Sequence, residues 1–391
     1  MRKMLTKFLF FVNRYTASPP VSLSVYRYSY FLKPLYAAVS AIQCGGPDNL
    51  PRRKTNDNSP IPVRYKNCSQ TRTGLLLLPM FLLAIISCGK PEITEAPSFV
   101  ILSICNLPGY SQGIDVSGDF AYVANGQGGL QIIDVADPES TSIVGEQPTP
   151  RSAQGVAVRE GFAYVVLTSE LGLYVIDVTE PSACSLVGQD PGYTEYNICA
   201  PPDTFYVYIA AHDFFIIENC SIPNLPFWEQ RIPTPGNVHG IFVAHSLAYL
   251  ACEQMGLYIY YAARPDSAVP LLGSIDTPSN ARNVYVEGDY AYVADGRAGL
   301  IIIDVSDTEA PSITGQYDTP GYANDVFVVN DFAYIADGDA GVQVVDVTDP
   351  AQPLFYASIE TSYANDVYVK DDLLYIADRD MGLIIATEEV E

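Results

Sequence analysis

The chain has 391 residues, of which 48% are hydrophobic, and its formal net charge at pH 7 is −24. This length and apolar content are sufficient for a folded domain with a buried core. The acidity opposes binding to nucleic acid or to an anionic lipid surface through simple charge attraction. We therefore expect no nucleic-acid partner, whereas cations or basic partners would suit this charge.

Residues 1–73 differ from the rest of the chain in charge. They contain 12 lysines and arginines against only two acidic residues, Asp48 and Asp57, and they lack the repeated phrases described below. We expect this segment to lie upstream of the true start of the protein. The alternative is a genuine N-terminal extension.

Residues 74–88 are typical of a secretory signal. Arg72 precedes an apolar core of roughly 12 residues, and a small residue and a cysteine follow the core. The sequence Ile85-Ile-Ser-Cys88 resembles the lipobox of bacterial lipoproteins, which implies a lipid on Cys88. The alternative is an uncleaved membrane anchor, for which the core is short.

The same resemblance implies an address in the cell envelope. Gly89, rather than an aspartate, follows Cys88, which implies the outer membrane or the cell surface rather than retention at the inner membrane. Residues 89–96 would then be a linker, and the protein would reach the membrane only through its lipid. Without residues 1–87, which carry +10, the net charge becomes about −34.

From residue 97 onward the chain is repetitive. Seven tyrosines recur at intervals of 41 to 43 residues, each in a phrase similar to Phe332-Ala-Tyr-Ile-Ala336: Tyr122, Tyr164, Tyr206, Tyr249, Tyr292, Tyr334 and Tyr375. A fixed period of this length is typical of a repeat architecture. Within one period, four short apolar runs are separated by turn residues such as Asn330-Asp331 and Asp337-Gly338. These runs predict four antiparallel strands.

A single four-stranded meander cannot bury both of its apolar faces, and a ring of meanders solves this problem. The seventh repeat ends after its third strand, Leu383-Ile-Ile-Ala386, and the first repeat is preceded by Pro97–Ser103, which matches a fourth strand. We therefore predict an all-β fold over residues 97–391: a seven-bladed β-propeller of four-stranded antiparallel blades, closed by the N-terminal strand.

The third strands and the turns after them resemble the LVIVD-repeat family of bacterial and archaeal surface propellers. The resemblance rests on the phrases Tyr174–Pro181, Ile302–Ser306 and Val344–Pro350. It weakens in blades three and four, where Glu218 and Tyr261 replace the aspartate of the phrase. The resemblance implies a cell-envelope propeller without an assigned molecular role.

Meander geometry places the links between blades and the turns between second and third strands at the same rim of the ring. Polar side chains from several blades would converge there around the central channel. The candidate binding residues on links are His239, Arg282, Asn283, Asn324, Asp325, Asn365 and Asp366, and those on turns are Asp295, Asp337 and Asp378.

An alternative explanation applies to each of these residues, because Asn and Asp are common in turns for backbone reasons. Carboxylate and carbonyl oxygens also allow Ca²⁺, although no complete calcium-loop spacing occurs in the repeats. Recurring inner-strand aromatics could stack on a sugar, but inter-blade packing explains them more simply: Phe242, Tyr285, Phe327 and Tyr368.

A catalytic signature is missing from the sequence. The chain has three histidines, His212, His239 and His245. We expect His239 on a link at the mouth and His245 at the opposite rim, so that these two do not meet. We therefore expect a monomeric module for protein–protein interaction or surface adhesion, whose partner is an unknown protein or surface ligand. The alternative is a hydrolase or lyase that uses carboxylates at the mouth with help from His239.

Blades three and four hold further irregular features. Trp228, the only tryptophan, would mark a partner site if it is exposed and would belong to the core if it is buried. Cys199 and Cys220 both fall in blade three, and an exported compartment permits a disulfide between them. Packing of each as a free thiol is the simpler expectation.

Overall fold

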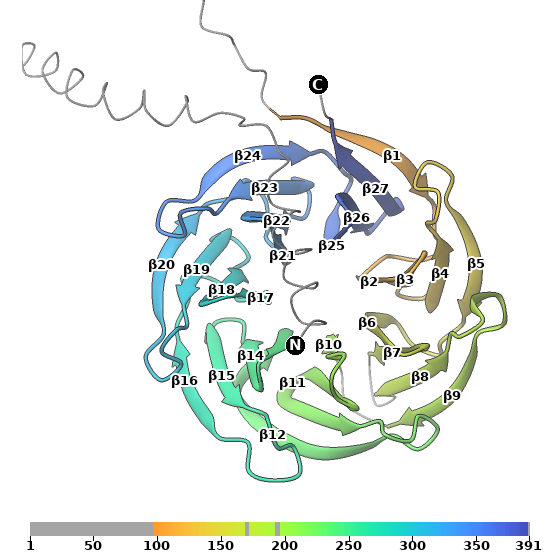
Figure 1. Ribbon diagram of the computed structural model, residues 1–391, viewed down its shortest axis with the longest axis horizontal. Coiled ribbons are helices and arrows are strands. Elements are labelled where there is room, and N and C mark those ends of the chain that lie inside the picture. Colours follow the sequence, from red (N-terminus) through yellow and green to blue (C-terminus); the bar gives the residue numbers. More distant parts are fainter. Residues whose placement is uncertain (1–96, 169–171, 192–195, 390–391) are drawn as a thin grey trace, which may run out of the picture. The chain divides into compact units, whose positions relative to one another are not determined.

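The computed structural model of this chain describes residues 97–168, 172–191 and 196–389, all within the unit Pro91–Glu391. These residues form seven antiparallel sheets arranged as a closed ring (Figure 1). The seven-bladed propeller predicted from the repeat is confirmed. The expectations for residues 1–96, including the signal and Cys88, fall outside the described residues.

Each blade begins at the channel and ends at the perimeter. The innermost strands are β2 (Gly113–Ser117), β6 (Ala153–Arg159), β10 (Asn197–Cys199), β13 (Gly240–Ala244), β17 (Asn283–Glu287), β21 (Asp325–Val329) and β25 (Ala364–Lys370). The second strands are β3 (Phe120–Ala124), β7 (Phe162–Leu167), β14 (Leu247–Ala251), β18 (Tyr290–Ala294), β22 (Phe332–Ala336) and β26 (Leu373–Asp378).

The third strands are the most buried. They are β4 (Leu130–Asp134), β8 (Leu173–Asp177), β15 (Leu257–Tyr261), β19 (Leu300–Asp304), β23 (Val342–Asp346) and β27 (Gly382–Glu388). In blade 3, β11 (Tyr206–Asn219) fills both the second and the third position. The outermost strands are β1 (Phe99–Cys105), β5 (Ser142–Gln147), β9 (Ser185–Asp190), β12 (Phe227–Val238), β16 (Leu271–Ile275), β20 (Ser312–Tyr317) and β24 (Leu354–Ile359). One 3-10 turn, η1 (Pro181–Ala183), precedes β9.

Blade 7 joins the two ends of the ring. Strand β1 pairs antiparallel with β27, so that Phe99 lies opposite Glu388 and Cys105 opposite Leu383. The order of this sheet is β1-β27-β26-β25. The N-terminal strand therefore supplies the fourth strand of the last blade, as the sequence predicts.

The ring has two faces, which differ in the loops they carry. Bridges such as Gly296↔Ala323 and Gly338↔Ala364 join a turn between second and third strands to the link that enters the next blade. We call the face with these turns and links the mouth face. The opposite face, which we call the base face, carries the turns between first and second strands and the loops between third and fourth strands.

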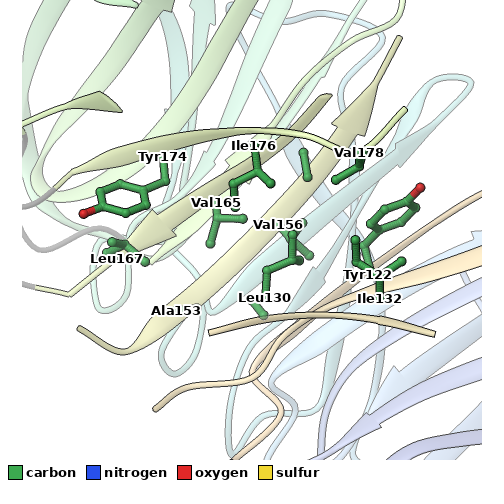
Figure 2. Close-up of a cluster of buried hydrophobic side chains, with 12 residues drawn as sticks. Tyr122, Leu130, Ile132, Ala153, Val156, Val165, Leu167, Tyr174, Ile176 and Val178 are labelled. Atoms are coloured by element: carbon green, nitrogen blue, oxygen red, sulfur yellow. The ribbon is translucent and has the colours of Figure 1, made fainter. Parts of the chain in front are cut away.

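The core lies between the blades rather than within them. Seven apolar clusters occupy the seven interfaces between neighbouring blades. In the first interface, Leu130 and Ile132 of blade 1 pack with Val156, Val165 and Ile176 of blade 2 (Figure 2). Burying one such side chain is worth about 1.5–3 kcal/mol. This arrangement explains why the third strands are apolar on both faces.

Blade 3 differs from the expected alignment by one residue. Asn219 takes the position of Asp134, because its Oδ1 accepts a hydrogen bond from Ser221 N as Asp134 Oδ1 does from Ala136 N. Glu218, which lies opposite Trp228, therefore occupies the place of the core residue Ile133. The expectation that Glu218 replaces the repeat aspartate is wrong, whereas Tyr261 does replace it.

Glu218 is buried beside a second acid. Its exposed fraction is 4%, and Asp190 at the end of β9 shares a hydrogen bond with it. Burial, followed by the charge of Asp190, raises the pKa of Glu218 to about 8. Cys199 and Cys220 nearby are free thiols. A carboxyl group in a core position of blade 3 is thus kept protonated by its surroundings at neutral pH.

This carboxyl makes stability fall as the pH rises. The folded protein holds the Glu218 proton more tightly than the unfolded chain, so its contribution to stability is lost between about pH 4.5 and about pH 8. We expect Glu218→Gln to raise the free energy of unfolding at pH 8 by roughly 2 kcal/mol or more, with little effect at pH 4. Chemical denaturation at both pH values, with the exposed Glu309→Gln as control, tests this. An unchanged pH dependence in Glu218→Gln would refute it.

Candidate functional site

A cavity of about 400 Å³ lies in the central channel, and all seven innermost strands or the links before them contribute to its lining. Of the predicted binding residues, the cavity brings together all those on the links: His239, Arg282, Asn283, Asn324, Asp325, Asn365 and Asp366. These predicted residues are up to 127 positions apart in the chain, from His239 to Asp366.

The outer ring of the cavity consists of one polar or aromatic residue from each blade. In blade order these are Gln112, Gln154, Tyr196, His239, Arg282, Asn324 and Asn365. Several of them tie neighbouring blades together: Asn324 Nδ2 donates to Ala364 O at 3.1 Å, and Asn365 Nδ2 donates to Ser111 O at 2.6 Å. The ring is thus built partly by hydrogen bonds between blades.

Arg282 is the only lysine or arginine among the described residues that line the cavity. Its Nη1 lies 3.9 Å from Glu253 Oε1, and its guanidinium lies 5.9 Å from the centre of the Tyr322 ring. No described residue accepts a hydrogen bond from its buried Nε. The Nε is thus enclosed without an acceptor from the described residues, whereas the side chain as a whole is 25% exposed.

His239 is stacked rather than paired with an acid. Its ring lies 4.5 Å from that of Tyr196, and the two planes are inclined by 12°. Burial, followed by the charge of Arg282, lowers the pKa of His239 to about 3. The imidazole is therefore neutral at neutral pH. His245 lies on the β13–β14 turn of the base face, away from the cavity rim that His239 occupies.

A second ring, one residue further along each strand, carries carboxylates that link blades 6, 7 and 1. Asp325 Oδ2 accepts from Val367 N at 3.0 Å, and Asp366 Oδ2 accepts from Ile114 N at 3.1 Å. Asn283 Nδ2 donates to Asp325 Oδ1. These bonds satisfy backbone N–H groups of the next innermost strand, and the bond from Asp366 crosses the junction between the two ends of the ring.

Asp325 and Asp366 also interact directly. Burial, followed by the neighbouring charge of Asp325 and a hydrogen bond to it, raises the pKa of Asp366 well above its ordinary value. Two negative charges side by side are therefore disfavoured at this buried position.

Below the carboxylates, four aromatic rings form an arc over blades 4 to 7. Successive ring centres of Phe242, Tyr285, Phe327 and Tyr368 lie 4.7, 4.8 and 5.1 Å apart, with planes inclined by 45–48°. All four line the cavity. Neighbouring rings contact one another at these angles, so the arc presents a continuous, largely apolar wall to the cavity.

Asp115 is a cavity residue that the sequence analysis missed. It takes the position of these aromatics in blade 1, and its Oδ2 accepts from Val158 N at 2.7 Å. Burial raises its pKa to about 6. An alignment of the seven repeats would have revealed this residue, because Asp115 stands where the other blades have an aromatic or a small side chain.

The three turn aspartates, Asp295, Asp337 and Asp378, are fully buried and do not line the cavity. Their oxygens accept hydrogen bonds from the preceding link; Asp337, for example, binds Thr319 Oγ1 at 2.6 Å and Gly321 N at 2.7 Å. Burial raises the pKa of Asp337 to about 6. These residues hold the mouth loops in place. The described residues contain no cluster of three His, Cys, Asp or Glu side chains suited to a metal ion.

The comparison with protein families agrees with the blade pattern. The profile of the LVIVD repeat matches residues 108–149, 150–189, 278–319, 320–361 and 362–386, which cover blades 1, 2, 5, 6 and 7. The chain carries LVIVD repeats. The matched segments leave out blades 3 and 4, which contain the displaced Glu218 and the substituted Tyr261.

Among solved structures, the chain is similar to the computationally designed Ika8 protein. The TM-score is 0.53 at 8% sequence identity, and the match covers 72% of this chain and 98% of that one. At this identity the similarity concerns the fold alone. The curated proteins gave no match.

The inter-blade carboxylates lead to a test of their structural role. Asp366→Asn keeps an oxygen acceptor for Ile114 N–H and removes the repulsion with Asp325, so we expect the free energy of unfolding to change by less than about 0.5 kcal/mol. Asp366→Ala leaves that N–H without its acceptor and should cost about 1–3 kcal/mol. Chemical denaturation at pH 7 compares the two. Equal losses in both variants would show that the charge itself, and not the hydrogen bond, is needed.

Proposed function

We propose that this protein is a lipid-anchored propeller of the cell envelope that binds a protein loop or a small surface ligand at its mouth and acts as a monomer. The observation that carries the proposal is the cavity at the mouth face, where polar groups from all seven blades meet above an apolar wall. A concave site with few placed polar groups in an apolar setting is typical of ligand binding.

Arg282 supports a specific contact within this cavity. Its guanidinium lines the cavity on a side chain that is 25% exposed, and it suits a partner with an acceptor oxygen, such as a carboxylate or a backbone carbonyl. The surrounding acids Asp115, Asp325 and Asp366 already accept hydrogen bonds from neighbouring strands. We therefore assign recognition to Arg282 and the outer ring, and blade assembly to the carboxylates.

The alternative of a carboxylate hydrolase or lyase has less support. His239 is neutral and stacked on Tyr196, so it is a weak base and cannot serve as a cationic acid. Asp325 and Asp366 lie side by side, as the two carboxyl groups of an acid–base pair do, but both are engaged in joining blades. We therefore favour binding without chemical turnover.

The position at which the chain enters the ring is compatible with a lipid anchor at Cys88. Glu388 ends β27 at the base face, and Phe99 lies opposite it, so the chain enters the ring at the base face. An anchor at Cys88 would then hold the base face toward the membrane and leave the mouth open to partners. In the described part of the chain, no helix is long and apolar enough to cross a membrane.

Crosslinking in intact host cells tests the mouth as the binding surface. A photo-reactive residue in place of Gln154, at the mouth, should give discrete adducts, whereas the same residue in place of Asp119, on the base face, should not give them. Adding Arg282→Ala should reduce the adduct roughly tenfold, because a hydrogen bond to a charged group is lost. Identical adduct patterns from the two positions would contradict a mouth-specific partner.

The anchor has its own test. We expect mass spectrometry of membrane-extracted protein to find a mature chain that begins at a diacylated Cys88. Cys88→Ser should move the protein out of the membrane fraction or leave it unprocessed. A membrane-extracted chain that still contains residues 1–87 would rule out the lipoprotein assignment.

A further inference from the structure

Blade 3 exposes large apolar side chains at one place on the base face. Five side chains form this group, which we call the blade 3 patch, and their exposed fractions run from 46% to 66%: Phe205, Ile222, Leu225, Phe227 and Trp228. The loop between the third and fourth strands carries Ile222 and Leu225, and β12 begins with Phe227 and Trp228. Phe205 is tied to the same loop because Cys220 N donates to its carbonyl oxygen at 3.1 Å.

Trp228 is therefore exposed, not a core residue. Its exposed fraction is 57%, and β12 lies on the outer wall of the ring (Figure 1). An indole in water costs solvation free energy that burial would recover. Contiguous apolar surface of this kind marks a site that contacts a partner or a membrane.

The patch lies where a loop of the otherwise acidic base face has no acidic residue. The corresponding loops of the regular blades carry exposed acids, among them Asp137 and Glu139, Glu180, Asp307 and Glu309, and Asp349. The blade 3 loop, residues 219–226, contains no acidic residue, and in the blade 4 loop Asp266 is offset by Arg264. The acids near the patch are Asp203 in the preceding turn, Glu229, which accepts a hydrogen bond from Asn219 Nδ2, and the buried Glu218 opposite Trp228.

The patch and the entry of the chain share one face. Phe99 enters blade 7 at the base face, and Cys88 precedes it by 11 residues, which span at most about 36–40 Å. A tether of this length holds the base face within reach of the surface to which Cys88 is attached. Of the partners that could cover the patch, a lipid surface is the one that this tether keeps close to it at all times.

We propose that the blade 3 patch inserts into the lipid surface that carries the Cys88 anchor and fixes the orientation of the propeller on it. This proposal rests on the lipid anchor of the proposed function. Ile222 and Leu225, at the loop tip, enter the apolar region, and Phe227 and Trp228 lie at the interface, where aromatic residues are favoured. The acids of the other blades stay in water, and the mouth face points away from the membrane.

Trp228 provides a direct test because it is the only tryptophan of the chain. Tryptophan emission therefore reports on the patch alone, even when the full-length lipidated protein is held by its anchor. We expect emission from vesicle-bound protein to shift to the blue, and phosphatidylcholine with brominated acyl chains to quench it more than half relative to unbrominated vesicles. Flotation measures the bound fraction separately.

The variants Leu225→Asp and Leu354→Asp form a matched pair. Leu225 and Leu354 are exposed by 66% and 63%, and Leu354 lies at the start of the outermost strand of blade 6, where Phe227 lies in blade 3. We expect Leu225→Asp to abolish most of the quenching and Leu354→Asp to leave it unchanged. Both side chains are exposed, so folding, followed by far-ultraviolet circular dichroism, should not change.

Two results would overturn the proposal. One is vesicle-bound protein whose Trp228 emission does not differ between brominated and unbrominated lipid. The other is a blue shift without lipid that grows with protein concentration together with dimer formation, which would identify a second copy of this chain as the occupant. Failure of lipidation alone is distinguishable, because it lowers the bound fraction in flotation but not the quenching of the protein that remains bound.

Discussion

No blade of this propeller can bury its own sheet, and every other feature follows from that constraint. The third strands are apolar on both faces, and the seven apolar clusters each require residues from two neighbouring blades. The ring must therefore close. Closure depends on β1 pairing with β27 and, at the channel, on Asp366 accepting the hydrogen bond from Ile114 N.

The candidate site is a consequence of the same closure. Its outer ring takes one residue from each blade, and its carboxylates join blades 6, 7 and 1 across the chain ends. An open stack of the same blades would have the same strands but no cavity. The binding that we propose at the mouth would thus be coupled to folding of the ring through the innermost strands.

Most of the architecture was predictable because it repeats. The interval between the phrase tyrosines gave the blade count, and the unfinished seventh repeat indicated the closing strand. The displacement of Glu218 was missed because Tyr208, and not Tyr206, takes the place of the phrase tyrosine in blade 3: it pairs with Cys199 of the innermost strand, as Tyr122 pairs with Asp115 in blade 1. Sequence spacing also does not distinguish a buried carboxylate that binds its own link, such as Asp337, from one that faces the channel, such as Asp366.

Departures from seven-fold regularity carry the functional information. The aromatic arc covers only blades 4 to 7, and among the described loops between third and fourth strands only that of blade 3 contains no acidic residue. A protein selected only to form a ring would have no need for these differences. In the function that we propose, they would separate a mouth that binds partners from a base that faces the membrane.

An engineered disulfide between the two ends of the ring tests closure most directly. Val100 and Thr387 face each other across the β1–β27 pair, and neither is buried. With Val100→Cys and Thr387→Cys in one chain, the account predicts that mild oxidation joins residues 100 and 387 within the same molecule in most of the protein, as seen by peptide mass spectrometry. If only intermolecular or no such disulfides form in the folded protein, the closed ring is contradicted.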